Sequence, residues 1–282
     1  MTALSIEDAR EILLDRNVVA VGARGDDERR RRHGARTTFV RVFEIHTDAV
    51  TSSLPSGVSA GEVRLTGRPP SVAAAIASVK AARVLAGNIP LTGYSLADLL
   101  DLVDGNVSSL TDLAGRLGAA GLTTLSEAPV DAVANPIESV RAARHGGLDV
   151  PRLTVRDASD DRLQAIVIAR DIQDAVGGVR AFAPLPRVTS IAQPTTGYDD
   201  VRQIAVARLL AHNIASIQVD WALYGPKLAQ VALTMGADDV DGISPLEGDL
   251  GRRRSPIEEI RANITAAGLE PVERNGAWAW SA

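Results

Sequence analysis

Apolar and polar positions alternate with two different periods along this 282-residue chain. Short runs rich in β-branched residues predict buried strands, and longer runs with helical spacing separate most of them. The predicted strands cover residues 37–45, 62–66, 89–92, 122–125, 152–155, 179–183, 216–219 and 239–241. The predicted helices cover residues 6–14, 18–33, 71–85, 96–103, 110–119, 137–145, 160–176, 199–212, 226–235 and 256–267.

The order of these elements predicts the fold. Strands that alternate with helices of this length are typical of parallel βαβ units, and eight units in about 250 residues match a (β/α)8 barrel of the TIM type. An open doubly wound sheet is the rival, but the chain has neither a GxGxxG turn after an early strand nor a GxxxxGK[ST] motif. We expect residues 1–282 to form a single domain, with N-terminal helices over 1–35. A turn signal at Asn275-Gly276 predicts that residues 268–282 form a hairpin or strand that closes one end.

Composition and charge narrow the function classes. The net charge of −5 gives no support to a broad nucleic-acid-binding surface. The chain has no run of 18 apolar residues, so no membrane-spanning helix is predicted. The acidic, amphipathic N-terminus does not resemble a signal peptide. We therefore expect a cytoplasmic protein with no nucleic-acid or membrane partner. The chain has no cysteine, which excludes disulfides, thiolate zinc sites, cysteine nucleophiles and Cys-ligated iron–sulfur clusters.

Residues that follow the predicted strands are the candidates for chemistry, because the active site of such a barrel lies at the C-terminal ends of its strands. Glu44, His46 and Asp48 alternate as in a strand, so their side chains share one face. A histidine beside two carboxylates could bind a divalent metal or act as an acid–base pair, and an ordinary polar strand end is the alternative. Asp131, after the fourth strand, is the remaining catalytic candidate. A lone histidine carries too little specificity to predict a metal site.

A second group of residues is predicted to bind a ligand. It consists of Arg64, Arg68, Arg156, Arg180, Asp220, Trp221, Tyr224 and Asp241. Converging arginines would hold an anionic small molecule, whereas outward solvation or ordinary ion pairing is the alternative for each. Arg64 and Arg180 fall within predicted strands, where an inward charge needs a partner. Trp221 and Tyr224 flank a strand end, so they either stack on a planar ligand or pack in the core.

Residues 177–242 carry a more specific signal than this pattern. They contain F-x-P-L at 182–185, the helix sequence QIAVARLLAHNI, G-P-K at 225–227 after Trp221, and GADDVDG at 236–242. This stretch closely resembles the C-terminal part of the menaquinone-pathway radical SAM enzymes, especially aminofutalosine synthase. The cyclic dehypoxanthinyl futalosine and deazaflavin-cofactor synthases are relatives. The N-terminal helices and the closing AAGLEPVER also fit, so the resemblance covers nearly the whole chain and implies a radical-SAM-type barrel.

The chain departs from that family where the family's chemistry resides. Members carry CxxxCxxC just after the first strand, where three thiolates hold a [4Fe–4S] cluster that cleaves S-adenosylmethionine. Here the corresponding stretch, IHTDAVTSSLPSGVSAGEV, has no cysteine. The family's glutamate after the third strand falls at Ser95, and its glycine-rich acidic turn after the fourth is reduced to SEAPVD, which leaves only Asp131. We therefore expect no cofactor, neither a [4Fe–4S] cluster nor bound S-adenosylmethionine.

Three functions follow from this combination. The one we favour is a cluster-less aminofutalosine synthase-like protein without radical chemistry, serving as an accessory or partner protein in menaquinone biosynthesis. Its partner would be a cysteine-bearing radical SAM homologue or a second copy of the chain. The second is a repurposed enzyme that performs lyase or hydrolase chemistry on an acidic or nucleoside-like molecule. The third is a module that binds a small molecule without turnover.

Overall fold

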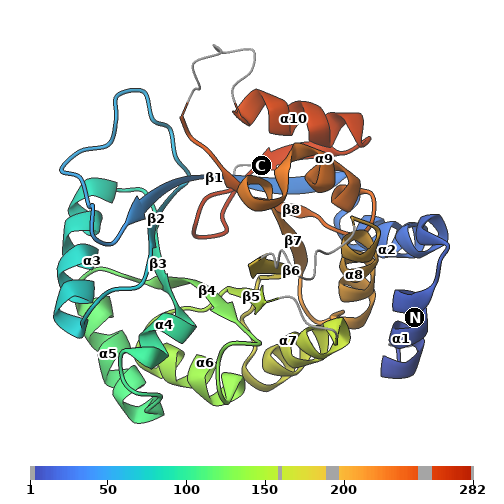
Figure 1. The fold of residues 1–282 in the computed structure, drawn as a ribbon. Coiled ribbons are helices and arrows are strands. Elements are labelled where there is room, and N and C mark those ends of the chain that lie inside the picture. The colour runs from blue at the N-terminus through green and yellow to red at the C-terminus, as the bar shows by residue number, and fades with distance from the viewer. Residues whose placement is uncertain (1–3, 158–160, 189–196, 247–255, 281–282) are drawn as a thin grey trace.

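The computed structural model describes residues 4–157, 161–188, 197–246 and 256–280. Within these ranges, eight parallel strands form a closed barrel with helices around it (Figure 1). Neighbouring strands follow one another along the chain from β2 to β8, and β1 pairs with both β8 and β2 to close the ring. The barrel strands are β1 (Arg36–His46), β2 (Glu62–Thr66), β3 (Leu91–Ser95), β4 (Thr124–Pro129), β5 (Arg152–Asp157), β6 (Ala181–Val188), β7 (Ser216–Asp220) and β8 (Asp239–Ile243). The predicted (β/α)8 barrel is confirmed.

Helices cover the outside of the barrel, and two more precede it. The covering helices are α3 (Val72–Ala86), α4 (Leu96–Asp101), α5 (Val107–Ala119), α6 (Pro136–His145), α7 (Arg162–Val176), α8 (Gly197–Leu210), α9 (Trp221–Leu233) and α10 (Pro256–Ala266). The N-terminal pair, α1 (Ile6–Leu14) and α2 (Val18–His33), lies beside α8 (Figure 1). No helix in the described ranges has the length and apolarity needed to cross a membrane.

Local sequence explains where several helices begin. Ser5, Asn17 and Ser71 are N-caps whose side-chain oxygens accept the backbone N–H three residues further on, at 3.0, 3.1 and 3.2 Å. Such caps satisfy donors that the first turn leaves free. On α5, leucines 110, 113 and 117 recur at helical spacing and are fully buried. This apolar stripe packs into the layer between helices and barrel, where most of the hydrophobic core lies.

Close packing of α2 on α8 depends on a glycine. A Cβ at Gly25 would lie 2.3 Å from the Met235 carbonyl oxygen and 3.1 Å from the Ala205 side chain. A hydrogen atom is therefore the largest group that this position accommodates. The N-terminal helices are held on the barrel by this close contact together with the buried side chains of Ala9, Ile12 and Val21.

Strand β6 extends well beyond its predicted range of 179–183. Pro184 and Pro186 lie inside it, and proline normally argues against a central strand because it cannot donate to the ladder. The register between β5 and β6 shifts between Thr154 and Val155, and Val155 lies opposite Pro186. The irregular pairing accommodates the two prolines, which explains why the sequence prediction ended too early.

The closing segment forms a strand and a tight hairpin. Strand β9 (Glu270–Glu273) pairs in parallel with the first four residues of β1, and Arg274 and Trp280 form an antiparallel bridge. The Gly276 amide donates to the Gly61 carbonyl at 3.0 Å, just before β2 begins. This places residues 274–280, which we call the basal hairpin, at the N-terminal end of the barrel (Figure 1).

Candidate functional site

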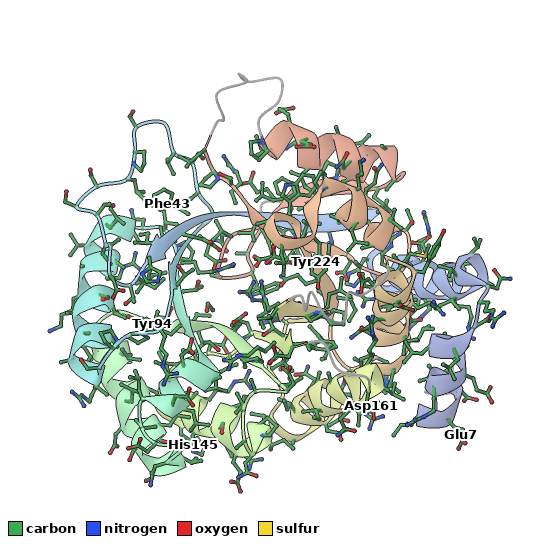
Figure 2. The ribbon with its side chains drawn as sticks, in the orientation of Figure 1. Glu7, Phe43, Tyr94, His145, Asp161 and Tyr224 are labelled. Carbon is green, nitrogen blue, oxygen red and sulfur yellow. The ribbon has the colours of Figure 1, made fainter. Side chains whose placement is uncertain are left out.

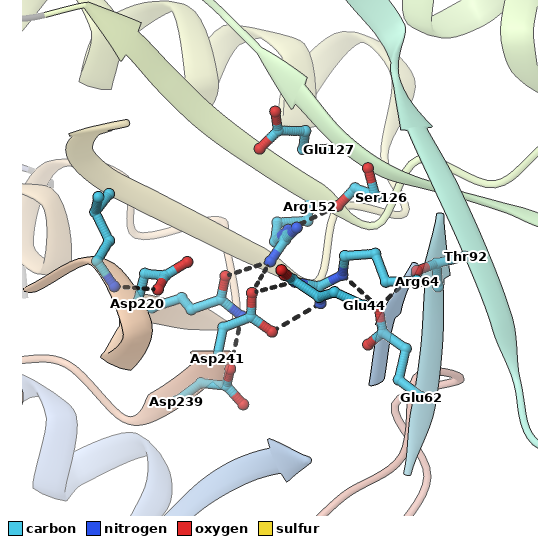
Figure 3. A network of polar contacts seen from close by, with 12 residues as sticks. Glu44, Glu62, Arg64, Thr92, Ser126, Glu127, Arg152, Asp220, Asp239 and Asp241 are labelled. Carbon is cyan, nitrogen blue, oxygen red and sulfur yellow. Dashed lines mark hydrogen bonds and ion pairs between the residues drawn. The ribbon is translucent and has the colours of Figure 1, made fainter. Parts of the chain in front are cut away.

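An ion-pair network crosses the inside of the barrel (Figure 3). At its centre, Arg64 of β2 donates to both carboxylate oxygens of Asp241 of β8, at 2.9 Å each. The Nε of the same guanidinium donates to Glu62 at 2.7 Å, and the Thr92 hydroxyl donates to that same glutamate oxygen at 2.5 Å. All four side chains are buried. Charged groups therefore occupy a barrel interior that branched aliphatic residues fill in many such folds.

A second arginine reaches the same carboxylate from the opposite side of the ring. Arg152 of β5 donates to Asp241, and its Nε donates to the Ser126 carbonyl at 2.7 Å. Burial alone would raise the pKa of Asp241, but the charges of Arg152 and Arg64 hold it well below its usual range. Burial, together with the nearby Arg64 charge, lowers the pKa of Arg152. Asp241 is thus a permanent anion shared by two cations.

A lower layer of the network lies toward the N-terminal end of the barrel. Arg274 of the basal hairpin binds both oxygens of Asp239, at 2.6 and 2.8 Å. The Thr38 hydroxyl and the Gln218 amide donate to the same carboxylate at 2.5 and 2.7 Å. The hairpin is therefore attached to the barrel strands through fully buried polar contacts.

At the C-terminal mouth, another arginine bridges two carboxylates. Arg187, at the end of β6, lies 3.1 Å from Glu127 and 2.5 Å from Asp220. Glu44 of β1 also faces this region, and its nearest cationic partner is Arg64, 3.8 Å away. Although 58% of the Glu44 side chain is exposed, loss of hydration is the main cause that raises its pKa, and the charges of Asp241 and Asp220 add to it.

The network leaves little free volume on the barrel axis. The cavity bounded by Arg64, Arg152 and Asp241 measures about 10 Å³, which is about the space that a single water molecule needs. Residues of the basal hairpin, Arg274 to Trp278, bound it from below.

The predicted acid–base group is only partly assembled. His46 and Asp48 lie beside each other at the end of β1, with 3.6 Å between His46 Nδ1 and Asp48 Oδ2. Both are more than half exposed, and Glu44 contacts Arg64 rather than this pair. In the described ranges, no three acidic or histidine side chains are arranged to hold a metal ion. The geometry gives a solvated His–Asp pair next to a separate glutamate.

Asp131 lies elsewhere and holds a loop. Its two carboxylate oxygens accept the backbone N–H groups of Arg156 and Asp157, at 2.7 and 2.8 Å. The carboxylate therefore fixes the end of β5 to the β4–α6 connection. A cavity of about 370 Å³ lies beside it, lined mostly by apolar groups of α6, α7 and the neighbouring strand ends.

The predicted ligand-binding arginines do not converge. Arg68 pairs with Asp101 on the surface at 3.1 Å, and Arg156 lies 3.9 Å from Asp98. Arg180 precedes β6 and therefore lies at the N-terminal end of the barrel, opposite the mouth. Only Arg64 of the four points into the interior network, where it has the partners expected of an inward charge.

The aromatic candidates are engaged by the protein itself. Trp221 is buried in the hydrophobic core, which favours the core-packing alternative. The Tyr224 hydroxyl (Figure 2) donates to the Pro186 carbonyl at 2.5 Å, and burial raises its pKa. Asp220 caps α9 by accepting the Leu223 N–H at 2.9 Å while pairing with Arg187.

Sequence reasoning missed most of the interior network. Arg152, Glu62, Asp239 and Arg274 were not among the predicted site residues. A signal was present in the strands, where charged residues recur two apart, as in EVR at 62–64 and DVD at 239–241. Residues two apart in a strand point to the same face, so these charges had to face inward together.

The residues after β1 do not fit the cluster that the family resemblance implies. Three thiolates are needed for a site-differentiated [4Fe–4S] cluster, and residues 47–61 supply threonine, serine and aspartate side chains but no cysteine. His46 and Asp48 are the nearest potential ligands, and no third group joins them in the described ranges.

Comparisons with known proteins confirm the resemblance. Residues 180–282 match the family described as the CofH/MqnC C-terminal region. An aminodeoxyfutalosine synthase of Thermus thermophilus is 37% identical over 131 residues, which is 41% of this chain and 35% of that protein. A 5-amino-6-(D-ribitylamino)uracil–L-tyrosine 4-hydroxyphenyl transferase of Methanococcoides burtonii is 30% identical over 203 residues, covering 59% of this chain and 57% of the relative. Each match covers less than two thirds of the relative's own length.

A solved crystal structure matches the fold over nearly the whole chain. The crystal structure of methylornithine synthase (PylB) superposes with a TM-score of 0.64, covering 95% of this chain and 94% of that chain, at 14% identity. The fold is therefore a TIM-type (β/α)8 barrel like that of methylornithine synthase.

Proposed function

We propose that this chain is a cluster-less aminofutalosine synthase-like protein that acts as an accessory partner of a cysteine-bearing relative. In this role it performs no radical chemistry, holds no [4Fe–4S] cluster and does not bind S-adenosylmethionine. Its place is the cytoplasm, in the futalosine route to menaquinone. The resemblance to aminodeoxyfutalosine synthases supports the pathway, and the absence of cysteine supports the loss of the cluster.

One observation carries the proposal. Charged side chains inside the barrel and at its mouth, where a barrel of this type would bind a ligand, are paired with one another. Asp241 is bound by two arginines, and Arg187 bridges the two carboxylates at the mouth. A buried ion pair with complete hydrogen bonding is costly to separate, because removing one partner leaves the other charge buried without a counter-charge. The interior network therefore keeps Arg64, Arg152 and Asp241 bound to one another rather than free to bind a substrate.

The rim of the mouth supports a docking role. Val188, Tyr198, Leu223 and Leu246 are all exposed. Each lies at or just after the end of a barrel strand, or in the first turn of the helix that follows, so all four are on the mouth side of the barrel. Exposed apolar side chains at a barrel mouth can form part of a protein interface. We assign this rim to the cysteine-bearing relative.

Co-expression tests the assignment. The full chain is produced with the cysteine-bearing aminofutalosine synthase of the same organism, and complex formation is measured by size-exclusion chromatography with light scattering. We expect a heteromeric complex that Leu223→Asp weakens at least about tenfold, because a buried carboxylate is costly at an apolar interface. Val84→Asp is the matched control, since Val84 is exposed on α3, away from the mouth. Separate elution of the two proteins, or equal effects of both variants, would contradict the proposal.

A non-radical enzyme is the second candidate, and the exposed groups at the end of β1 favour it. Glu44 and the His46–Asp48 pair are open to solvent beside the mouth, where they could exchange protons with a bound molecule. Crystals soaked with an aminofutalosine-type nucleoside distinguish the two functions. A nucleoside ordered against Glu44 and His46 would favour the enzyme over the accessory protein.

A further inference from the structure

A second cavity lies at the opposite end of the barrel from the mouth. It has a volume of about 340 Å³, within the range of small-molecule pockets. We call it the basal cavity. It is lined by the C-terminal end of α2, the first residues of β1 and β7, the residues preceding β6 and β8, and the basal hairpin. Its lining includes Arg36, Arg180, Asp238, Arg274, Trp278 and Trp280.

Two of its arginines lack counter-charges. No carboxylate in the described ranges forms an ion pair with Arg36 or Arg180, whereas most arginines of the chain have one. The lining carboxylate, Asp238, is already bound by Arg208 and by the backbone N–H of Ile217. The cavity therefore presents positive charge that the protein does not neutralise.

Two of the chain's three tryptophans line the same cavity. The Arg274 guanidinium lies 3.8 Å from the centre of the Trp278 ring, and the Arg36 guanidinium lies 5.1 Å from the Trp280 ring. In such contacts the guanidinium lies over the face of the ring, and a planar ligand can also stack on an indole.

The basal hairpin holds these rings in a defined position. The Asn275 side-chain oxygen accepts the N–H groups of Ala277 and Ala279, at 3.0 Å each. Trp278 has a φ of 62°, in the left-handed region that a bulky side chain rarely occupies. Such a conformation persists only where the surroundings impose it, and it is often found at binding sites.

We propose that the basal cavity binds a small anion with a planar ring, an aromatic carboxylate or a phosphate ester. Arg36 and Arg180 recognise the anionic group, since a guanidinium offers paired donors to carboxylate and phosphate alike. The indole rings of the basal hairpin stack on the planar part. This site is separated from the mouth by the interior network, so it stands independently of the accessory role.

Calorimetric titration of the full chain tests the site with two matched pairs of probes. Adenosine 5′-monophosphate and benzoate carry the two anionic groups, and adenosine and benzyl alcohol are their neutral counterparts. We expect at least one anion to bind with quenching of tryptophan fluorescence, at least about tenfold more tightly than its neutral counterpart. The better anion identifies the phosphate or the carboxylate class.

Variants locate the binding. Arg36→Gln and Arg180→Gln are each expected to weaken the anion about tenfold, while Arg10→Gln, on the exposed face of α1, leaves affinity unchanged. Circular dichroism confirms that each variant is folded. The proposal is wrong if neither anion binds, if a neutral probe binds equally well, or if the Arg36→Gln/Arg180→Gln double variant keeps its affinity.

Discussion

Arg64 and Asp241 form a two-point ion pair across the barrel, with 2.9 Å between each guanidinium nitrogen and its carboxylate oxygen. The two residues are 177 positions apart in the sequence and are both almost completely buried. Arg152 contacts the same carboxylate from β5. The pair thus joins β2, β5 and β8 and closes the interior of the barrel by charge rather than by apolar packing.

Removal of the shared anion should destabilise the whole barrel. Asp241→Asn leaves Arg152 buried without its counter-charge and Arg64 with Glu62 as its remaining buried partner. Loss of one partner of a buried ion pair typically costs about 3–5 kcal/mol. Urea denaturation measures the free energy of unfolding. Asp48→Asn is the control, because Asp48 is exposed and should change that free energy by less than about 0.5 kcal/mol. Equal effects of the two substitutions would mean that the network contributes little.

Glu44 should lower stability at neutral pH. Its pKa in the folded chain is raised above the ordinary 4.5, mainly by loss of hydration, so ionisation is less favourable in the folded state than in the unfolded one. This penalty is absent below pH 4.5 and grows as the pH rises through the folded pKa. Glu44→Gln should therefore stabilise the chain at pH 7, by less than about 1 kcal/mol because the group is half-exposed. Urea titrations at pH 7 and pH 4 should show the gain only at pH 7.

Two glycine substitutions should act in opposite directions. Gly25→Ala introduces a methyl group 2.3 Å from the Met235 carbonyl oxygen, which should cost about 1–3 kcal/mol through overpacking. In α5, a Cβ at Gly115 meets its nearest neighbour at 3.8 Å, so Gly115→Ala should gain about 0.5–1 kcal/mol from helix propensity. Thermal unfolding of both variants tests the pair, and a stabilising Gly25→Ala would contradict the close contact of α2 with Met235 and α8.

Asp131 should behave as a structural clamp. Asp131→Ala removes two acceptors of backbone N–H groups and should lower the free energy of unfolding by about 1–3 kcal/mol. Hydrogen exchange of the Arg156 and Asp157 amides should increase in the same variant. Unchanged exchange at these two amides would show that the clamp is absent in solution.

The sequence predicts the barrel better than it predicts the interior. Strands β1 and β2 were predicted to within one residue at each end, because β-branched residues bounded by turns are a local signal. Pro184 and Pro186 cut the prediction of β6 short, since their tolerance depends on an irregular register with β5. The start of α9 was missed because Gly225, with a φ of 75°, and Pro226 interrupt the helical pattern after its first turn.

The interior network depends on contacts between residues that are far apart in the sequence, and the local sequence pattern does not predict such contacts. Arg152 contacts a carboxylate 89 positions away, and nothing near it in the sequence indicates that partner. Arg180 is grouped with the converging arginines because it falls within a predicted strand, but β6 begins at Ala181, so Arg180 lies just before the strand. The ligand-binding roles assigned to the mouth residues remain predictions, whereas the geometry shows Arg64 and Asp241 bound to each other.

The rate at which S-adenosylmethionine is cleaved to 5′-deoxyadenosine tests the central claim most directly. It is measured anaerobically with iron, sulfide and reductant, for the chain alone, for its cysteine-bearing relative alone, and for the two together. We predict no 5′-deoxyadenosine from the chain alone, and a rate from the mixture that differs at least about twofold from that of the relative alone. Formation of 5′-deoxyadenosine by the chain alone, or a mixture indistinguishable from the relative, would contradict a cluster-less accessory role.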